Sequence, residues 1–146
     1  MSSLTENYFI DDVTELGYEA MRAPGSGTRA NHEAGDIWVV ASERDLTRVW
    51  IVEEKYKSND QKTIFEDGEK LDSMIEFAEK INAIPLMACR WSTRQEWSPG
   101  AFHIVRDARL VSRTKSDNFS MQPQRAIDNG FVSLDKYFNN RYGTYF

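Results

Sequence analysis

Residues 35–55 read GDIWVVASERDLTRVWIVEEK and contain two apolar segments joined by a polar one. Residues 36–41 and 49–55 are rich in Trp, Ile and Val, which are residues that favour strands. The polar segment 42–47 between them suits a hairpin connection. The stretch therefore predicts two neighbouring antiparallel strands.

Helices and further strands are predicted on both sides of this hairpin. Before it, apolar residues recur at helical spacing over residues 4–16, and Gly17 follows as a residue that ends helices. After it, a second amphipathic helix is predicted over residues 71–81. Further elements are predicted as strands over 18–22, 85–91 and 102–106 and as a short helix over 133–138. This order predicts an α/β fold built in layers.

The length and composition indicate one globular domain. The 146 residues suffice for a single core, which we expect over residues 4–106, with a C-terminal extension over residues 107–146. Cys89 is the only cysteine, so an internal disulfide is excluded. The apolar runs are too short to span a bilayer, and the N-terminus lacks the order of a signal peptide. We therefore expect a cytoplasmic protein without membrane contact.

The charge distribution leaves room for a nucleic-acid partner despite a net charge of −5. Five of the 23 acidic residues lie within residues 1–21, which contain no Lys or Arg, so the rest of the chain holds 18 charges of each sign. Residues 103–115 carry four basic residues against one acidic residue. This segment predicts either a contact with a phosphate backbone or a solvated basic loop.

Three residues of the predicted hairpin suit phosphodiester hydrolysis. Glu53 and Lys55 lie two positions apart in a strand, so their side chains leave the same face, and Asp36 opens the neighbouring strand. Two nearby carboxylates repel each other, and a hard cation such as Mg²⁺ relieves that repulsion while polarising a phosphate. Lys55 would orient a water molecule or neutralise charge on the phosphate. Glu54 is expected on the opposite face, although its pairing with Lys57 remains an alternative.

Several motifs then occur in an order that resembles a nuclease superfamily. Their positions are GYEAMRAPGSG at 17–27, GDI at 35–37, VEEK at 52–55, IEFA at 75–78 and IPLMA at 84–88. Together they resemble the superfamily with a PD-(D/E)XK core, and in particular the archaeal Holliday-junction resolvases. The resemblance runs from about Glu6 to Trp91.

The resemblance implies a restriction-endonuclease-like fold, in which helices flank a central mixed β-sheet, and an active site at defined residues. It implies a metal site at Asp36 and Glu53, a catalytic Lys55, a further catalytic and metal-binding acid at Glu6, and a loop serine, Ser26, near the cleaved phosphate. The cofactor implied is Mg²⁺, with Mn²⁺ as a substitute. The partners implied are branched DNA and a second copy of the chain, because the family acts as a homodimer in which each subunit cuts one strand of a four-way junction.

Two of these residues also have ordinary structural interpretations. Glu6 with Ser3 matches a capping box, although its spacing from Phe9 places it on the buried stripe of the helix. Ser26 otherwise reads as a turn hydroxyl.

Gly35 stands where the family has proline, which changes backbone stiffness but no metal ligand.

Basic residues around the site are expected to contact DNA. These are Arg22, Arg29, Lys57 and Lys62, for which solvated surface charge is the alternative. Phe77 on the second predicted helix is a candidate dimer contact or a plain core residue.

The prediction is therefore a structure-selective, metal-dependent endonuclease that resolves four-way DNA junctions with paired nicks. One alternative is a nuclease of the same superfamily that acts on duplex or flap DNA in repair or restriction. A second alternative is a non-catalytic DNA-binding protein that keeps the fold.

Overall fold

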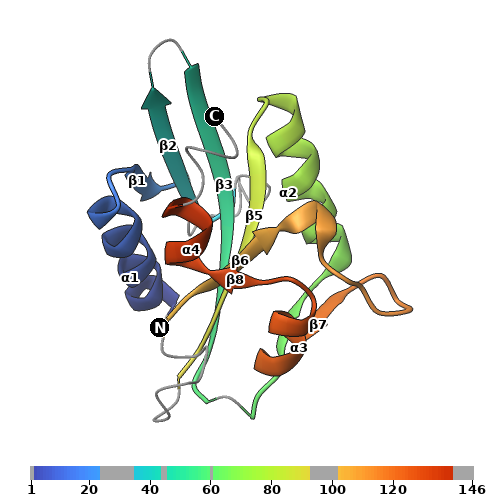
Figure 1. The fold of residues 1–146 in the computed structure, drawn as a ribbon. Coiled ribbons are helices and arrows are strands. Elements are labelled where there is room, and N and C mark those ends of the chain that lie inside the picture. The colour runs from blue at the N-terminus through green and yellow to red at the C-terminus, as the bar shows by residue number, and fades with distance from the viewer. Residues whose placement is uncertain (1, 24–34, 44–45, 60, 93–101, 140–146) are drawn as a thin grey trace.

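A mixed sheet of six strands forms the centre of the described part of the chain (Figure 1). The computed structural model of the chain describes residues 2–23, 35–43, 46–59, 61–92 and 102–139. The strands are β1 (Glu19–Arg22), β2 (Ile37–Glu43), β3 (Leu46–Lys57), β4 (Ile64–Glu66), β5 (Ile84–Trp91), β6 (Ile104–Asp107), β7 (Phe119–Met121) and β8 (Val132–Ser133). The helices are α1 (Ser2–Glu15), α2 (Gly68–Lys80), the short 3₁₀ helix η3 (Ala108–Leu110), α3 (Pro123–Asp128) and α4 (Leu134–Asn139). No helix in these ranges is long and apolar enough to cross a membrane.

The predicted hairpin is present and lies within the large sheet. Its strands β2 and β3 are antiparallel, with Ile37 opposite Val52. Strand β3 also pairs with β5 in parallel, beginning with Trp50 opposite Ile84. Parallel neighbours need a crossover connection, and α2 provides it. The strand order is β1-β2-β3-β5-β6-β8, and β4 pairs with β7 in a separate small sheet.

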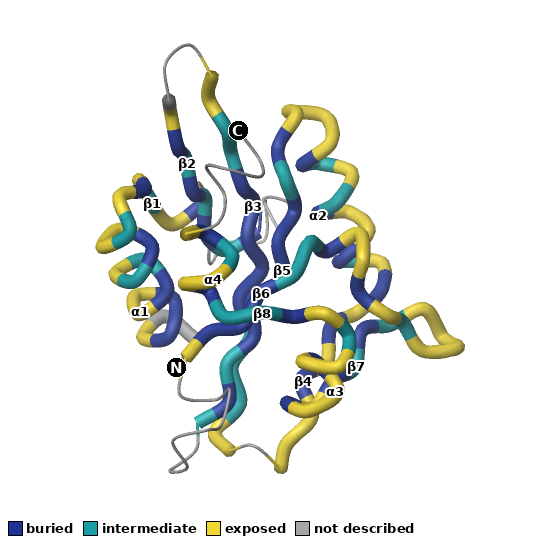
Figure 2. Tube along the Cα trace, viewed as in Figure 1, coloured by how far each residue is buried: buried dark blue, intermediate teal, exposed yellow. Residues whose placement is uncertain are grey.

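Two apolar clusters cover the two faces of the large sheet. On one face, Ile51 of β3 packs with Leu71 and Met74 of α2. On the other face, Val52 packs with Phe9 of α1. Figure 1 shows α1 and α2 on opposite sides of the sheet, and Figure 2 shows β3 buried along its middle. Successive residues of β3 therefore point alternately toward α2 and toward α1.

Residues near β7 anchor the start of α2. Asn118 accepts a hydrogen bond through Oδ1 from the Gly68 backbone N–H at 2.8 Å. A side chain at Gly68 would collide with the carbonyl oxygen of Asp117. The Asp67 side chain caps the helix by accepting a hydrogen bond from the Lys70 backbone N–H at 3.2 Å. The first turn of α2 is therefore held by its own N-cap residue, Asp67, and by Asn118 from the C-terminal third of the chain.

Three short strands, β4, β7 and β8, were not predicted from the sequence, whereas the short helix predicted over 133–138 is present as α4. Strands β4, β7 and β8 have two or three residues each, which is too few to show an alternating pattern. The polar segment between the hairpin and α2, for which no element was predicted, contains β4. This difference matters because β4 contributes a residue to the candidate site.

Candidate active site

Asp36 is held against the end of β3 by two hydrogen bonds. Its backbone N–H donates to the Val52 carbonyl oxygen at 2.7 Å. Its Oδ2 accepts from the Glu54 backbone N–H at 2.9 Å. Because Ile37 lies opposite Val52, Asp36 lies one step further along the same register, opposite Glu53. The structure therefore brings Asp36 and Glu53 to one place, as the hairpin predicted.

Glu53 and Lys55 share the face of β3 that points toward α2. Glu53 is buried, with 3% of its surface exposed, and the Lys55 side chain is 28% exposed. Lys55 Nζ lies 3.7 Å from Glu53 Oε2. Both residues and Asp36 line a pocket of about 350 Å³. The three residues selected from the sequence are therefore neighbours, and their chemical roles remain predictions.

Two further charged residues, Glu66 and Lys70, complete this cluster and were missed from the sequence. Lys70, in the first turn of α2, places its Nζ 3.3 Å from Glu53 Oε2. Glu66, at the end of β4, is buried and lies 3.2 Å from Lys55 Nζ through Oε1. The only sequence signal for either residue was a pair of opposite charges four positions apart, which is common on helix surfaces.

Burial and mutual repulsion raise the pKa values of the acidic residues. Burial raises the pKa of Glu53 well above its ordinary value, and the charge of Asp36 and the neighbouring Glu66 raise it further, while Lys70 lowers it. Burial also raises the pKa of Asp36, against the opposing effects of the Glu54 backbone N–H and Lys70. Two neighbouring carboxyl groups with raised pKa values are costly to ionise together. A cation bound between them lowers that cost, so binding of a cation is favoured here.

The donor chemistry of this pair fits a divalent cation. Asp36 and Glu53 offer hard carboxylate oxygens, and their repulsion is relieved by a positive charge between them. Within the described ranges, no group of three or more His, Cys, Asp or Glu side chains is arranged to hold a metal ion. Glu6 nevertheless lines the same pocket as Asp36 and Glu53, and its role as a metal ligand stays a prediction. Two carboxylates suit Mg²⁺, which usually keeps several water molecules and takes few protein ligands.

Glu6 lies near Asp36 but is paired with a base from β1. Its carboxylate forms an ion pair with Arg22, whose second terminal nitrogen donates to Asn7 Oδ1 at 2.7 Å. Burial raises the pKa of Glu6, and the charge of Asp36 adds to this effect. Because α1 begins at Ser2, Ser3 lies inside the helix and not at its N-cap. The capping-box interpretation of Glu6 is therefore wrong for this helix.

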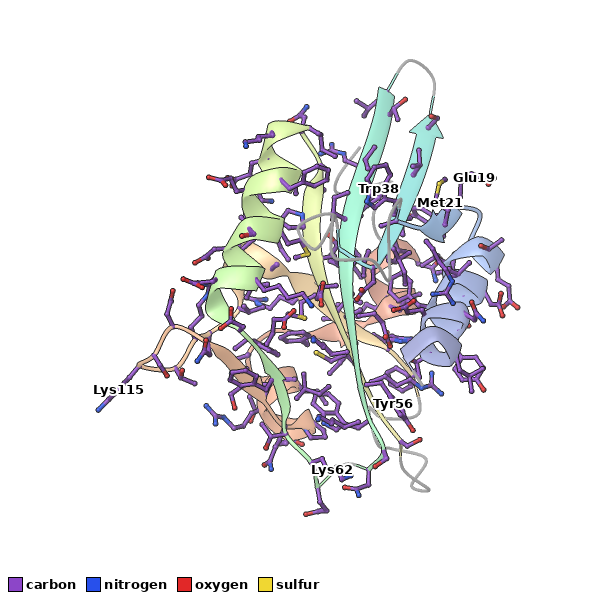
Figure 3. All side chains as sticks on the ribbon, turned by 180° about the vertical axis from the view of Figure 1, so that it is seen from behind. Glu19, Met21, Trp38, Tyr56, Lys62 and Lys115 are labelled. Atoms are coloured by element: carbon purple, nitrogen blue, oxygen red, sulfur yellow. The ribbon has the colours of Figure 1, made fainter. Side chains whose placement is uncertain are left out.

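The other predicted site residues are placed unequally. Ser26 and Arg29 lie outside the described residues, and Lys57 lines the same pocket as Asp36 and Glu53. Lys62 is exposed, and Figure 3 shows it at the end of the molecule where β3 leads into β4. Of the two lysines predicted to contact DNA, Lys57 therefore lies at the pocket and Lys62 does not line it.

Glu54 points to the opposite face of the sheet, where it pairs with His103. His103 Nε2 lies 2.8 Å from Glu54 Oε2, and both side chains are fully buried. The Thr5 hydroxyl donates to Glu54 Oε1 at 3.1 Å. The predicted alternation of Glu53 and Glu54 is therefore correct, while the alternative pairing of Glu54 with Lys57 is wrong. Nothing in the sequence connected His103 with Glu54.

The basic segment 103–115 is largely engaged within the protein. Arg109 forms an ion pair with Asp107 at 2.6 Å, and Arg113 forms one with Asp72 at 2.8 Å. Arg106 donates to the carbonyl oxygens of Leu110 and Gly130. These contacts favour a structural role for the segment over contact with a phosphate backbone.

Gly35 has a conformational role beside Asp36. Its φ is +73°, and a Cβ built there would lie 2.8 Å from the Val52 carbonyl oxygen. Proline, with φ fixed near −65°, cannot adopt this conformation. Glycine is thus required here by both backbone angle and space, which the sequence interpretation of altered stiffness did not foresee.

Replacing Gly35 with Ala is expected to lower the free energy of unfolding by about 2 kcal/mol, because it adds backbone strain and a collision. Gly17→Ala is the matched control, since Gly17 also has positive φ, +97°, but no atom of the described part of the chain lies within 4 Å of its Cβ position. Urea unfolding of both variants measures the difference. An equal loss of unfolding free energy in both variants would show that the Val52 backbone moves aside without a measurable energetic cost.

Comparisons with known proteins show the family and the fold to which the chain is similar. The family described as archaeal Holliday junction resolvase (Hjc) matches residues 5–132, which extends past the resemblance seen up to Trp91. Among solved structures, a Holliday junction resolvase from Archaeoglobus fulgidus is similar with a TM-score of 0.70 and 16% identity, covering 92% of this chain and 98% of that chain. This similarity confirms the predicted fold class, a restriction-endonuclease-like mixed sheet flanked by helices. A comparison with curated protein sequences found no match.

Proposed function

The chain belongs to the archaeal Holliday junction resolvase family, and we propose that this junction-resolving nuclease uses a divalent cation held by Asp36 and Glu53. The observation that carries the proposal is the approach of these two carboxylates beside Lys55 in one pocket. Carboxylate pairs with a nearby lysine meet the needs of phosphodiester hydrolysis. Burial raises the pKa of Glu53, and the charge of Asp36 raises it further, which supports a cation between the two carboxylates.

Each residue has a distinct role in this proposal. A cation, Mg²⁺ with Mn²⁺ as a substitute, supplies Lewis acidity and lowers the pKa of water. Lys55, whose ammonium is partly exposed to the pocket, orients the attacking water or neutralises charge on the phosphate. Glu6 is the further acidic residue, and its ion pair with Arg22 holds it at the edge of the site. Ser26 is proposed as a phosphate contact.

Basic residues from several elements are proposed to position the DNA. Lys57 lies at the pocket, and Lys62 lies beyond the end of β3 (Figure 3). Arg22 is shared between Glu6 and a phosphate in this proposal, since 37% of its side chain is exposed. Arg29 is proposed for the same role. Such contacts fix the position of the duplex without reading its sequence.

A homodimer is proposed because one site cuts one strand and a four-way junction needs two cuts. Phe77 of α2 stacks on Trp38 of β2, with ring centroids 6.4 Å apart, and both residues are half-buried. An aromatic pair that is partly exposed offers an apolar surface for a second copy of the chain.

The test incubates the protein with a labelled four-way junction, a matched duplex and a flap, each with Mg²⁺, Mn²⁺ or EDTA. The expected result is paired, symmetric nicks in the junction alone, present with either metal and absent with EDTA. Junction cleavage in EDTA would contradict the metal proposal. Equal cleavage of the duplex or flap would instead favour a repair or restriction nuclease of the same superfamily.

Asp36→Asn provides the control for the site, because it keeps the shape of the side chain and removes its charge. It is expected to abolish the paired nicks. Asp11→Asn changes an exposed residue of α1 in the same way and is expected to cleave as the wild-type protein does. Loss of cleavage in both variants would mean that the effect does not come from the Asp36 site.

A further inference from the structure

Two of the lysines at the pocket, Lys55 and Lys70, each contact the same two carboxylates. Lys55 Nζ lies 3.7 Å from Glu53 Oε2 and 3.2 Å from Glu66 Oε1. Lys70 Nζ lies 3.3 Å from Glu53 Oε2 and 3.8 Å from Glu66 Oε2. The charges therefore alternate around a ring, and the two lysines come from different elements, β3 and α2.

Glu66 is the buried member that joins the two lysines. Its side chain is 5% exposed, and each of its carboxyl oxygens faces a different ammonium group. A buried carboxylate is costly unless cations or hydrogen bonds compensate it. The backbone N–H of Asp67 donates a hydrogen bond to Oε1 at 3.2 Å, and Lys55 pairs with the same oxygen. Oε2 has no hydrogen-bond partner among the described residues, and the charge of Lys70 at 3.8 Å compensates it.

The lysines themselves stay open to the pocket. Their side chains are 28% and 37% exposed for Lys55 and Lys70, and both line the pocket that contains Asp36 and Glu53. Two fixed cations thus face the space where the DNA backbone is proposed to lie.

We propose that Lys70 is a second catalytic lysine that contacts the scissile phosphodiester, and that Glu66 is the positioning residue that holds Lys70 beside Lys55. The inference rests on the proposed function of this same site. Phosphodiester hydrolysis adds negative charge to the phosphate in the transition state, and fixed ammonium groups stabilise that charge. Lys70 also competes with a divalent cation for Glu53, because both are attracted to the same carboxylate.

Lys70→Met tests the first part, with Lys80→Met as the control, since Lys80 lies exposed at the end of the same helix. Single-turnover cleavage at saturating Mg²⁺ is expected to fall about tenfold to a hundredfold in Lys70→Met. The affinity of the DNA-free protein for Mn²⁺, followed by electron paramagnetic resonance, is expected to rise about threefold or more, because a competing positive charge is lost. Lys80→Met is expected to change neither quantity.

Two outcomes overturn the role of Lys70. Wild-type cleavage by Lys70→Met at saturating metal would leave Lys70 as a simple counter-ion. Unchanged or weaker Mn²⁺ binding would show that Lys70 does not compete at Glu53. Lys70→Arg keeps the charge if the Met variant does not fold, and it is expected to bind Mn²⁺ as the wild-type protein does. Failure of the wild-type protein to cleave junctions would contradict the proposed function instead.

Glu66→Gln tests the positioning role through its dependence on Lys70. Glu66→Gln is expected to lower the cleavage rate of the wild-type protein. In the Lys70→Met background the same substitution is expected to lower the rate by a smaller factor, because one of the two lysines that Glu66 holds is already absent. A merely structural loss would reduce the rate by the same factor in both backgrounds. That additive result would overturn the positioning role of Glu66.

Discussion

Glu53→Gln is expected to reduce junction cleavage on the order of 10³-fold or more, because it removes the negative charge that a divalent cation requires at this site. Junction binding in EDTA is expected to stay within about threefold of wild type, since the change lies at the chemistry and not at the phosphate contacts. Glu76→Gln, an exposed residue of α2, is the matched control. Comparable loss in both variants would contradict a specific role for Glu53.

The same substitution is expected to raise the melting temperature at neutral pH. The folded-state pKa of Glu53 lies well above its ordinary value of 4.5, so its protonation favours folding. This contribution is fully present below pH 4.5 and is lost as the pH rises through the raised pKa. At neutral pH the ionised Glu53 carboxylate therefore destabilises the folded state, and the uncharged Gln side chain removes this cost. Thermal unfolding in EDTA across this pH range measures the gap between variant and wild type, and a gap that does not widen with pH would contradict the assignment.

His103→Leu is expected to lower the free energy of unfolding by about 3–5 kcal/mol, because it leaves a buried carboxylate without its partner. Both Glu54 and His103 side chains are fully buried, and their charged or polar atoms lie 2.8 Å apart. The Thr5 hydroxyl still donates a hydrogen bond to Glu54 Oε1 in that variant, but it brings no positive charge. Urea unfolding at neutral pH provides the measurement.

The double variant Glu54→Val with His103→Leu provides the control for this prediction. It removes both polar groups, including His103 Nδ1, which is buried and has no hydrogen-bond partner among the described residues. Replacing a buried pair with apolar residues is often neutral or stabilising, so most of the lost stability is expected to return. A double variant no more stable than His103→Leu would show that the cavity, and not the orphaned carboxylate, dominates the cost.

The hairpin and its active face were predictable because they follow local periodicity. Alternation over residues 49–55 predicted which of Glu53 and Glu54 faces the pocket. The place of Asp36 opposite Glu53 depends on the register between β2 and β3, which only the structure gives. The family resemblance correctly indicated the fold class and a nuclease. The roles assigned to Glu6 and Ser26 stay predictions.

The rest of the site depends on contacts that no local pattern encodes. Glu66 lies in a three-residue strand whose partner is β7, far along the sequence. Lys70 reaches Glu53 only because α2 crosses back over β3. His103 and Glu54 are 49 positions apart. Buried polar pairs of this kind are selected by tertiary packing, and a single sequence does not reveal them.

The pairing of β4 with β7 determines how far the nuclease can be shortened. Glu66 lies opposite Phe119 in that small sheet, and Asn118 binds the first residue of the helix that carries Lys70. Residues 117–121, which the sequence placed in an extension, thus belong to the scaffold of the pocket. A truncated chain that keeps only the hairpin and α2 would retain Asp36, Glu53 and Lys55 but lose the support of Glu66 and Lys70. Minimal versions of this nuclease therefore need to include the segment through Met121.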